Sequence, residues 1–303
     1  MSLRQLLNRL FFLVTVTAAL ALVFLTAGIM VSLVVQSKPG FERFGFLNFL
    51  LSKDWNYGAE TFGALRPLTG TVLAALGAVA LATPVALGVA VFLTELCPEK
   101  LKGPIAMAIE LLAAIPSVIY GLWGLFVLAP FLETYFQPLV SYVFGSLPYV
   151  GDFFVAKAAG GLNLATASII LAVMILPFIA SLAREGFAQV PEVLKESAYG
   201  LGATCWETIT AVVWPTARKA VVGGIVMASG RALGETMAVA YVIGNRHGAL
   251  ESLFSPYVTI TSVIANEFNE AGPIQMSALF YLTLALFLAN LLVLSLAKRI
   301  MGK

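Results

Sequence analysis

Long uncharged apolar runs dominate the chain, and its charged residues gather in the stretches between them. A helix needs about 20 predominantly apolar residues to cross the hydrocarbon core of a bilayer. Five uncharged runs meet this length: Leu10–Ser37, Pro67–Thr94, Leu111–Leu132, Ala158–Ala183 and Ala271–Ala297. A sixth apolar segment, Ala220–Gly244, contains two charged residues, and counting it predicts six spans.

Two features qualify this pattern. Residues 134–151 are also uncharged, but their mixture of Gln, Pro, Gly and aromatic residues favours a short interfacial or re-entrant piece over a seventh span. Pro84, Pro116 and Pro177 lie inside predicted spans. Each proline removes a backbone donor and bends its helix, so we expect these three helices to pack against others or to line a cavity.

The composition also indicates a protein built in lipid. Of 303 residues, 60% are apolar and 11% are charged, whereas about 25% charged residues are usual in soluble proteins. A net charge of +2 does not indicate a nucleic-acid-binding protein. The two cysteines and one histidine do not have the spacing of a zinc site. We therefore expect an all-α polytopic membrane protein, divided into an N-terminal span with the first outer loop (1–66) and a transmembrane domain (67–303).

The distribution of basic residues predicts the orientation, because cytoplasmic segments carry an excess of Lys and Arg. With the N-terminus inside, the inner segments hold eleven of them: Arg4, Arg9, Lys100, Lys102, Arg184, Lys195, Arg218, Lys219, Lys298, Arg299 and Lys303. The outer loops hold six: Lys38, Arg43, Lys53, Arg66, Lys157 and Arg246. This bias favours both termini in the cytoplasm. The first span is expected to be retained, because its apolar run, Leu10–Ser37, exceeds the ~7–15 residues of a signal-peptide core.

A long charged segment, residues 184–219, joins the fourth and fifth predicted spans on the cytoplasmic side. Its two halves have the pattern of short amphipathic helices separated by Gly200 and Gly202. A helix lying on the membrane surface has this pattern. Periodicity alone leaves open whether the segment is a plain connector on the headgroups or a docking element.

The spacing within this segment resembles a loop motif of bacterial ABC import permeases of type I. The motif runs Glu-Ala-Ala, three residues, Gly, nine residues, Ile-x-Leu-Pro, and this chain departs from it at Ser197, Val212 and Trp214. In that family the loop forms coupling helices that dock in a groove of the ATP-hydrolysing subunit. The resemblance therefore implies an ATPase-coupling role for Glu196, Ser197, Ala198, Tyr199, Gly200, Gly202 and Pro215.

Two further stretches, FLTELCPEKLKGPIAMAIELLAAIPSVIYGLWGLF and SGRALGETMAVAYVIGN, resemble the phosphate-specific permeases of that family. The likeness covers nearly all of the chain from the first span to the last. Such importers pair two permeases of one architecture, and ELLAAIPSVIYG, WGLF and the long first outer loop match one of the two better than its partner. The resemblance implies inorganic phosphate as substrate and, as partners in a bacterial cell membrane, a second permease, an ATPase dimer and a phosphate-binding protein.

No GxxxxGK[ST] phosphate-cradling loop occurs in the chain. We therefore expect ATP and Mg²⁺ to be bound by the partner ATPase, with no cofactor, metal or catalytic residue in this chain. The chain would then be a transport subunit and not an enzyme.

Two ionisable residues, Arg231 and Glu235, lie within the sixth apolar segment. A central charge costs at least ~2.5–3.5 kcal/mol on insertion scales, so such residues usually face the bundle interior or a wet cavity. Their four-residue spacing places them on one helical face, where they can pair. One interpretation is mutual neutralisation. The other is an anion path, in which Arg231 binds phosphate through its planar fork and Glu235 accepts the proton that phosphate retains and sulfate lacks.

Other residues are weaker candidates for the path. Glu110 borders the third span and is a candidate for lining the path. Thr236, Ser117 and Tyr120 carry hydroxyl donors, although each residue type serves packing more often than ligand binding. His247 is expected to be a solvated residue of the outer loop after the fifth span.

The sequence can be compared with three kinds of transporter. The phosphate importer has the coupling motif in its favour, and its nearest alternatives are the partner permease of the same system or an ABC permease for another oxyanion such as sulfate. Glu235 disfavours sulfate. A secondary transporter is expected to show internal repeats, which are not evident here.

Overall fold

The computed structural model describes residues 3–148, 151–156 and 160–302, and helices form nearly all of the regular structure in these ranges. Six helical segments of the described chain are long and apolar enough to cross a membrane: Leu7–Phe44, Leu65–Leu96, Ser117–Phe144, Leu164–Ala188, Cys205–Gly234 and Pro273–Leu296. The predicted all-α polytopic fold with six spans is therefore confirmed. Ala158, the expected start of the fourth span, lies outside the described residues.

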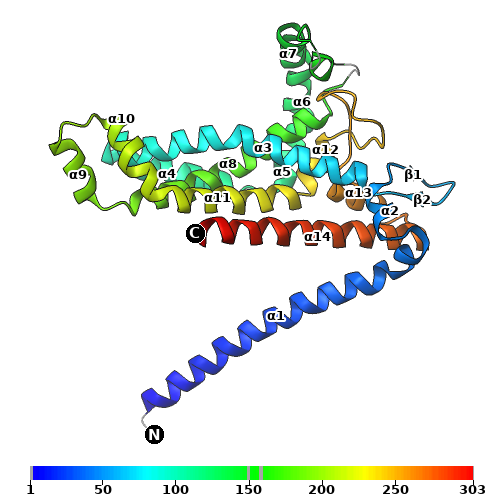
Figure 1. Ribbon diagram of the computed structural model, residues 1–303, viewed down its shortest axis with the longest axis horizontal. Coiled ribbons are helices and arrows are strands. Elements are labelled where there is room, and N and C mark those ends of the chain that lie inside the picture. Colours follow the sequence, from blue (N-terminus) through cyan, green and yellow to red (C-terminus); the bar gives the residue numbers. More distant parts are fainter. Residues whose placement is uncertain (1–2, 149–150, 157–159, 303) are drawn as a thin grey trace.

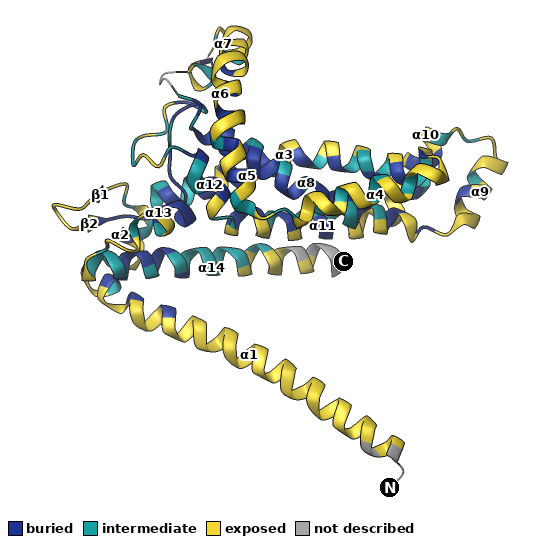
Figure 2. Ribbon diagram, turned by 180° about the vertical axis from the view of Figure 1, so that it is seen from behind, coloured by how far each residue is buried: buried dark blue, intermediate teal, exposed yellow. Residues whose placement is uncertain are grey.

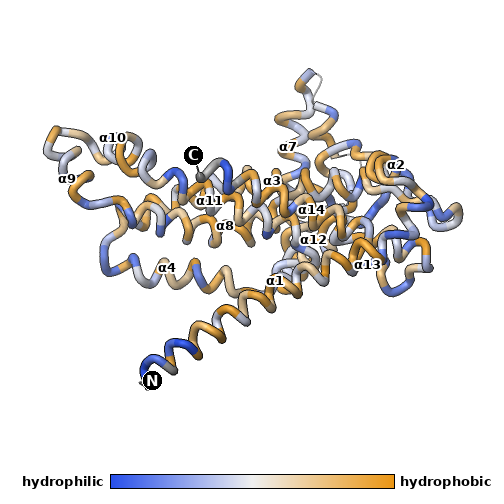
Figure 3. The backbone as a smooth tube through the Cα atoms, turned by 60° about the horizontal axis from the view of Figure 1, so that its bottom comes forward, coloured by the Kyte–Doolittle hydropathy of each residue, from blue (hydrophilic) through white to orange (hydrophobic). Residues whose placement is uncertain are grey.

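The elements follow one another as α1 (Leu3–Phe44), α2 (Phe46–Leu51), β1 (Trp55–Asn56), β2 (Thr61–Phe62), α3 (Leu65–Val91), η1 (Phe92–Leu96), α4 (Glu99–Ala114), α5 (Ser117–Trp123), η2 (Gly124–Leu128), α6 (Ala129–Phe131), η3 (Leu132–Phe136), α7 (Gln137–Phe144), η4 (Gly151–Phe154), α8 (Leu164–Ala188), α9 (Glu192–Gly200), α10 (Cys205–Thr208), η5 (Ile209–Val213), α11 (Trp214–Gly234), α12 (Met237–Val242), α13 (Ile260–Glu267) and α14 (Pro273–Gly302). Helices α3, α8, α11 and α14 lie side by side along the long axis of the molecule (Figure 1). Hydrophilic residues concentrate at the helix ends and connections (Figure 3).

Helix α8 forms the centre of this bundle. In its most apolar 18-residue window 72% of the residues are buried, against 6% for the N-terminal span. Helix α3 packs along α8 and buries an alanine at every fourth position: Ala74, Ala78, Ala82, Ala86 and Ala90. Such a row of small side chains lets two helices approach closely. Helices α3 and α8 therefore contact each other closely over much of their length. Buried residues gather on α8 (Figure 2).

Helix α1 leaves the bundle. Near its C-terminal end the Ser277 hydroxyl accepts from the Gly40 amide at 2.7 Å and donates to the Gln36 carbonyl at 3.1 Å. Toward the N-terminus the helix diverges from α14 and exposes its apolar side chains (Figures 1 and 2). Most of this span is therefore not covered by the rest of the chain.

Among the described residues, four wide, π-helical turns interrupt the helices, and each ends two residues before a proline. Turns η1, η2, η3 and η5 precede, in that order, Pro98, Pro130, Pro138 and Pro215. In each turn the amide immediately before the proline donates to the carbonyl five residues back; Trp214, for example, donates to Ile209. Proline lacks the donor for the next helical bond, so the wide turn accommodates the break.

The third span differs from the prediction. Pro116 does not lie inside a helix, because it caps α5 and separates it from α4. Thr134–Phe144 is not a separate re-entrant piece, since it continues the same helix through η3 and α7. This long helix projects sideways from the bundle (Figure 1). The wide turns before Pro130 and Pro138 let one helix continue where the sequence suggested an interruption.

The expectation for His247 was wrong, because the residue is part of a packed cluster at the end of the bundle that carries the β-hairpin. Its ring stacks on Trp55, with centroids 5.1 Å apart, and its Nε2 lies 3.0 Å from a carboxylate oxygen of Glu267. Trp55 Nε1 donates to the other oxygen at 3.1 Å and Gln275 Nε2 donates to it at 2.9 Å. The cluster joins the β-hairpin, the loop after α12, α13 and α14.

This cluster predicts a pH dependence of stability. Burial raises the pKa of Glu267, but hydrogen bonds with His247 and Tyr57 and the charge of His247 outweigh burial and lower the pKa below 4.5. A carboxyl with a depressed folded pKa stabilises the fold above its unfolded value, and this contribution is lost as the pH falls through the folded value. We expect the melting temperature in detergent to fall below pH 4.5 and E267Q to flatten that fall.

The melting temperature is measured by tryptophan fluorescence. The exposed carboxylate of Glu270 offers a matched control, because E270Q should keep the wild-type dependence of melting temperature on pH. An unchanged profile in E267Q would show that the carboxylate does not stabilise the cluster.

Candidate translocation path and coupling surface

The coupling segment forms a short helix followed by a sharp turn at its end. Helix α9 ends with two bonds, from Ala203 N to Ala198 O at 3.0 Å and from Gly202 N to Tyr199 O at 2.9 Å. Gly202 has φ +88°, a left-handed conformation that glycine adopts without steric cost. Gly200, by contrast, is an ordinary helical residue with open space around it. Of the two glycines, only Gly202 is required by the turn.

The turn after α9 lies at one extremity of the bundle (Figure 1), and several large apolar side chains around it are exposed. Leu201 is 90% exposed, Trp206 is 70% exposed and Val193 is 68% exposed. The sequence-derived coupling residues Glu196, Ser197 and Tyr199 are exposed too, as is Pro215 at the start of α11, while Ala198 is half-buried. A monomer rarely leaves such large side chains in water, so this surface is suited to a protein partner.

The second amphipathic half of the segment is continuous with the fifth span. Thr204 caps α10 in a capping box with Glu207, and the helix then runs through η5 into α11. The continuous helix that contains the fifth span therefore begins at Cys205, within the coupling segment, and ends at Gly234, ten residues before the end of the predicted Ala220–Gly244.

The two intramembrane charges lie at a break between helices. Helix α11 ends at Gly234, Glu235 has extended backbone angles, and α12 begins at Met237. Thr261 Oγ1 on α13 donates to the Glu235 carbonyl at 2.7 Å, and the Ala238 amide donates to the Glu235 carboxylate at 3.3 Å. Because the backbone leaves the helix at Glu235, the predicted helical i,i+4 geometry is lost.

Arg231 and Glu235 do not form an ion pair in the described part of the chain. Arg231 lies in the last turn of α11 and is exposed, whereas Glu235 is half-buried and held by the backbone. The interpretation in which the two side chains neutralise each other is therefore not met in this conformation. Instead, the guanidinium is presented at the bundle surface beside a helix end whose last carbonyls are negative poles.

Glu110 pairs with Arg184 and not with Arg231. Its carboxylate lies 3.2 Å from the Arg184 guanidinium, which joins α4 to α8. Contacts of Gly186 with Ala220, and of Gly224 with Leu182, place Arg184 level with residue 222 of α11. Arg231 lies about nine residues further along, or roughly 14 Å at 1.5 Å per residue. Glu110 is thus nearer to the coupling segment than to Arg231.

The hydroxyl candidates also have defined places. Tyr120 is buried, and its hydroxyl donates to the Leu112 carbonyl at 2.9 Å across the break that Pro116 makes. This bond satisfies a carbonyl at the end of α4, which is a structural task. Thr236 is half-buried at the start of α12 and bonds weakly to the Gly234 carbonyl at 3.3 Å. Ser117 is half-buried at the first position of α5.

Comparison with known proteins decides the family. The chain matches the family described as "Binding-protein-dependent transport system inner membrane component" over residues 86–302. It is 49% identical over 292 residues to the phosphate transport system permease protein PstC of Mesorhizobium japonicum, which covers 96% of this chain and 89% of that protein. It is 51% identical over 274 residues to PstC of Pasteurella multocida, with 90% and 85% covered. The chain belongs to the PstC permease family.

Solved structures agree on the fold of this PstC family member. It superposes on a chain of the inward-facing MetNI methionine ABC transporter with a TM-score of 0.56, covering 78% of this chain and 93% of that one. The sequence identity is 16%, so this likeness speaks for the fold alone. The type I ABC importer permease fold expected from the coupling motif is confirmed.

Proposed function

We propose that this chain is the PstC-type permease subunit of an ATP-driven importer of inorganic phosphate, forms half of its translocation pathway and couples that pathway to a separate ATPase. The observation that carries the proposal is the near full-length identity with phosphate transport permeases, 49% over 96% of the chain. The exposed coupling turn and the intramembrane arginine each have a task in such a machine.

The proposed assembly is a heterodimer with a PstA-like permease, joined by a PstB-like ATPase dimer and a PstS-like phosphate-binding protein. ATP and Mg²⁺ would be bound by the ATPase. The uncovered apolar surface of α1 supports further membrane-embedded partners, because lipid and helices are the only surroundings that suit it. The proposed location is a bacterial inner membrane with both termini in the cytoplasm.

In this proposal the anion path passes Arg231, because a planar guanidinium donates two parallel hydrogen bonds to phosphate oxygens. Glu235, at the adjoining helix break, accepts the proton of HPO₄²⁻ or H₂PO₄⁻ and repels sulfate. Thr236 and Ser117 supply hydroxyls near the break, Tyr120 holds the α4–α5 bend, and Glu110 lies nearer the coupling segment. A path site of this kind must bind weakly enough to release its ion.

The direct test is reconstitution of the chain with its three partner proteins in liposomes. We expect ATP-dependent uptake of radiolabelled phosphate, with sulfate uptake lower by roughly tenfold or more, since one unsatisfied charged hydrogen bond is worth about that factor. Sulfate carried as fast as phosphate would favour the general oxyanion permease. Phosphate uptake by the chain alone, without ATPase or ATP, would refute the ABC assignment.

The proposed orientation can be tested with the native thiols. Cys205 is half-buried at the start of α10, whereas Cys97 is buried. We expect a membrane-impermeant maleimide to label inside-out vesicles and to leave right-side-out cells unlabelled. Labelling should disappear in C205S, which retains Cys97 as the internal control. Labelling of intact cells at Cys205 would place the coupling turn outside and overturn the orientation.

A further inference from the structure

The attachment of the coupling helix α9 to the bundle is unusual, because its one buried residue is a lysine. An amphipathic helix normally attaches through an apolar face. Here Val193 and Leu194 are 68% and 45% exposed, while the Lys195 side chain is 9% exposed. Val193 and Leu194 are therefore available to a partner, and the one buried residue through which α9 contacts its own chain is charged.

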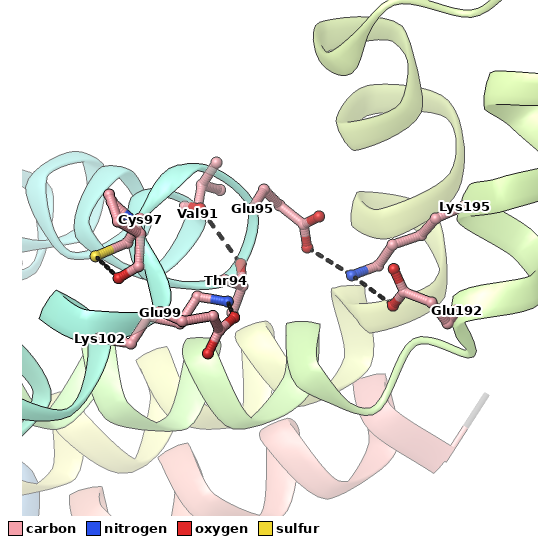
Figure 4. Close-up of polar contacts among 9 residues, drawn as sticks. Val91, Thr94, Glu95, Cys97, Glu99, Lys102, Glu192 and Lys195 are labelled. Carbon is pink, nitrogen blue, oxygen red and sulfur yellow. Dashed lines mark hydrogen bonds and ion pairs between the residues drawn. The ribbon is translucent and has the colours of Figure 1, made fainter.

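The partner of Lys195 is Glu95, 100 residues earlier in the sequence. Their Nζ and Oε1 atoms lie 2.8 Å apart, and the Glu95 side chain is 7% exposed (Figure 4). Glu192 approaches the same ammonium at 3.7 Å from within α9, but its side chain is 74% exposed. The short, buried contact is thus the Glu95–Lys195 pair, and Glu192 is a peripheral neighbour.

Glu95 connects this contact to the core. It lies on η1, the wide turn that ends α3. Helix α3 packs along α8 through its row of buried alanines. A displacement of α9 applied at Lys195 therefore acts on the cytoplasmic end of the closely packed α3–α8 pair.

Side-chain packing does not offer an equivalent connection to α4. A cavity of about 510 Å³ separates α9 from α4 and α8, and its lining includes Lys102, Arg184, Glu192 and Lys195. The side chains that face each other across this open space are not packed together, so they contribute little dispersion attraction between α9 and α4. The charged contact from Lys195 to η1 lies at the edge of this cavity.

We propose that Glu95 and Lys195 are positioning residues that fix the coupling helix to α3 and transmit its movement to the transmembrane core. The inference rests on the proposed function, in which an ATPase moves α9. Removing one partner leaves the other charge buried and uncompensated, so single neutralisation weakens the contact more than a matched exchange of both charges.

The test uses the complete importer in liposomes and compares wild type, K195M, E95Q and the exchange E95K/K195E. Three quantities are measured: ATPase retained on the purified permease, ATP hydrolysis, and phosphate taken up per ATP hydrolysed. E192Q serves as the matched control, because it removes the exposed neighbour of the same ammonium. Elution as a single species in size-exclusion chromatography checks the folding of each variant.

We expect K195M and E95Q to retain the ATPase and to hydrolyse ATP, while uptake per ATP falls by about tenfold or more. The exchange should restore most of the uptake per ATP, and E192Q should match wild type. Wild-type uptake per ATP in both single variants would overturn the inference. It would also be overturned if the single variants lost folding or ATPase binding to the same extent as uptake and the exchange restored none of these.

The two levels of the proposal fail differently. If wild type carries no phosphate, the proposed function fails whatever the variants do, and the link is then measured with the solute that is carried. If wild type carries phosphate and the single variants equal it, only the link fails.

Discussion

Replacement of Arg231 by Gln is expected to abolish phosphate uptake while the subunit still assembles with its partners. The guanidinium is exposed at the end of α11 and has no carboxylate partner among the described residues, so its loss leaves no buried charge uncompensated. Losing one hydrogen bond to a charged group costs about 1.5–3 kcal/mol, or roughly 10- to 150-fold, and a bidentate contact loses more. Uptake of radiolabelled phosphate by reconstituted importer measures the effect.

The same helix offers a matched control for this substitution. Arg218 is also exposed, but it lies near the start of α11 at the other end of the helix. We expect R218Q to transport within about twofold of wild type, because surface charges contribute little to local stability. If R231Q transports as well as R218Q, Arg231 has a structural role and the anion path lies elsewhere.

Replacement of Gly202 by Val is expected to uncouple or disassemble the importer while membrane insertion stays intact. Gly202 has φ +88°, where a side chain costs roughly 1–2 kcal/mol, and a β-branched one is a genuine outlier. The turn after α9 would relax to another conformation, and the exposed apolar surface around Leu201 would change shape. Retention of the ATPase on the purified permease, together with ATP-driven uptake, measures both consequences.

Gly200 provides the comparison within the same motif. It is helical, and a Cβ atom added to it meets no other atom within 4 Å. G200A should therefore be neutral or slightly stabilising, since Ala favours a helix by about 1 kcal/mol over Gly. Normal ATPase retention and coupling in G202V would contradict the docking role of this turn.

The sequence predicted the parts of the structure that depend on local patterns. Apolar runs gave the number of spans, since length and hydrophobicity suffice to identify a membrane helix. The two glycines Gly200 and Gly202 predicted the separation of two short helices, and the structure places the turn at Gly202. Pro84 and Pro177 lie inside α3 and α8 as expected.

Other features depend on contacts between distant segments and were missed for that reason. His247 was expected in solvent, but Trp55 and Glu267 enclose it, and no local pattern indicates that cluster. The Lys195–Glu95 contact joins positions 100 residues apart.

The interpretation in which Arg231 and Glu235 neutralise each other is not met in this conformation, because it assumed an uninterrupted helix. The helix instead ends between them at Gly234. The sequence also predicted Pro116 inside a helical span, whereas in the structure Pro116 separates α4 from α5. The wide turns before four prolines could have been anticipated in part, because each proline lacks a donor.

The wide turn η1 determines the direction in which the Glu95 side chain points around the helix axis. A π-helical turn contains one residue more than the α-helical turn it replaces, and each residue advances an α-helix by about 100°. Glu95 lies within η1, so the wider turn determines where its carboxylate points around the axis of α3. Shortening η1 by one residue would keep every side chain that forms the contact with Lys195, yet would aim the carboxylate away from α9.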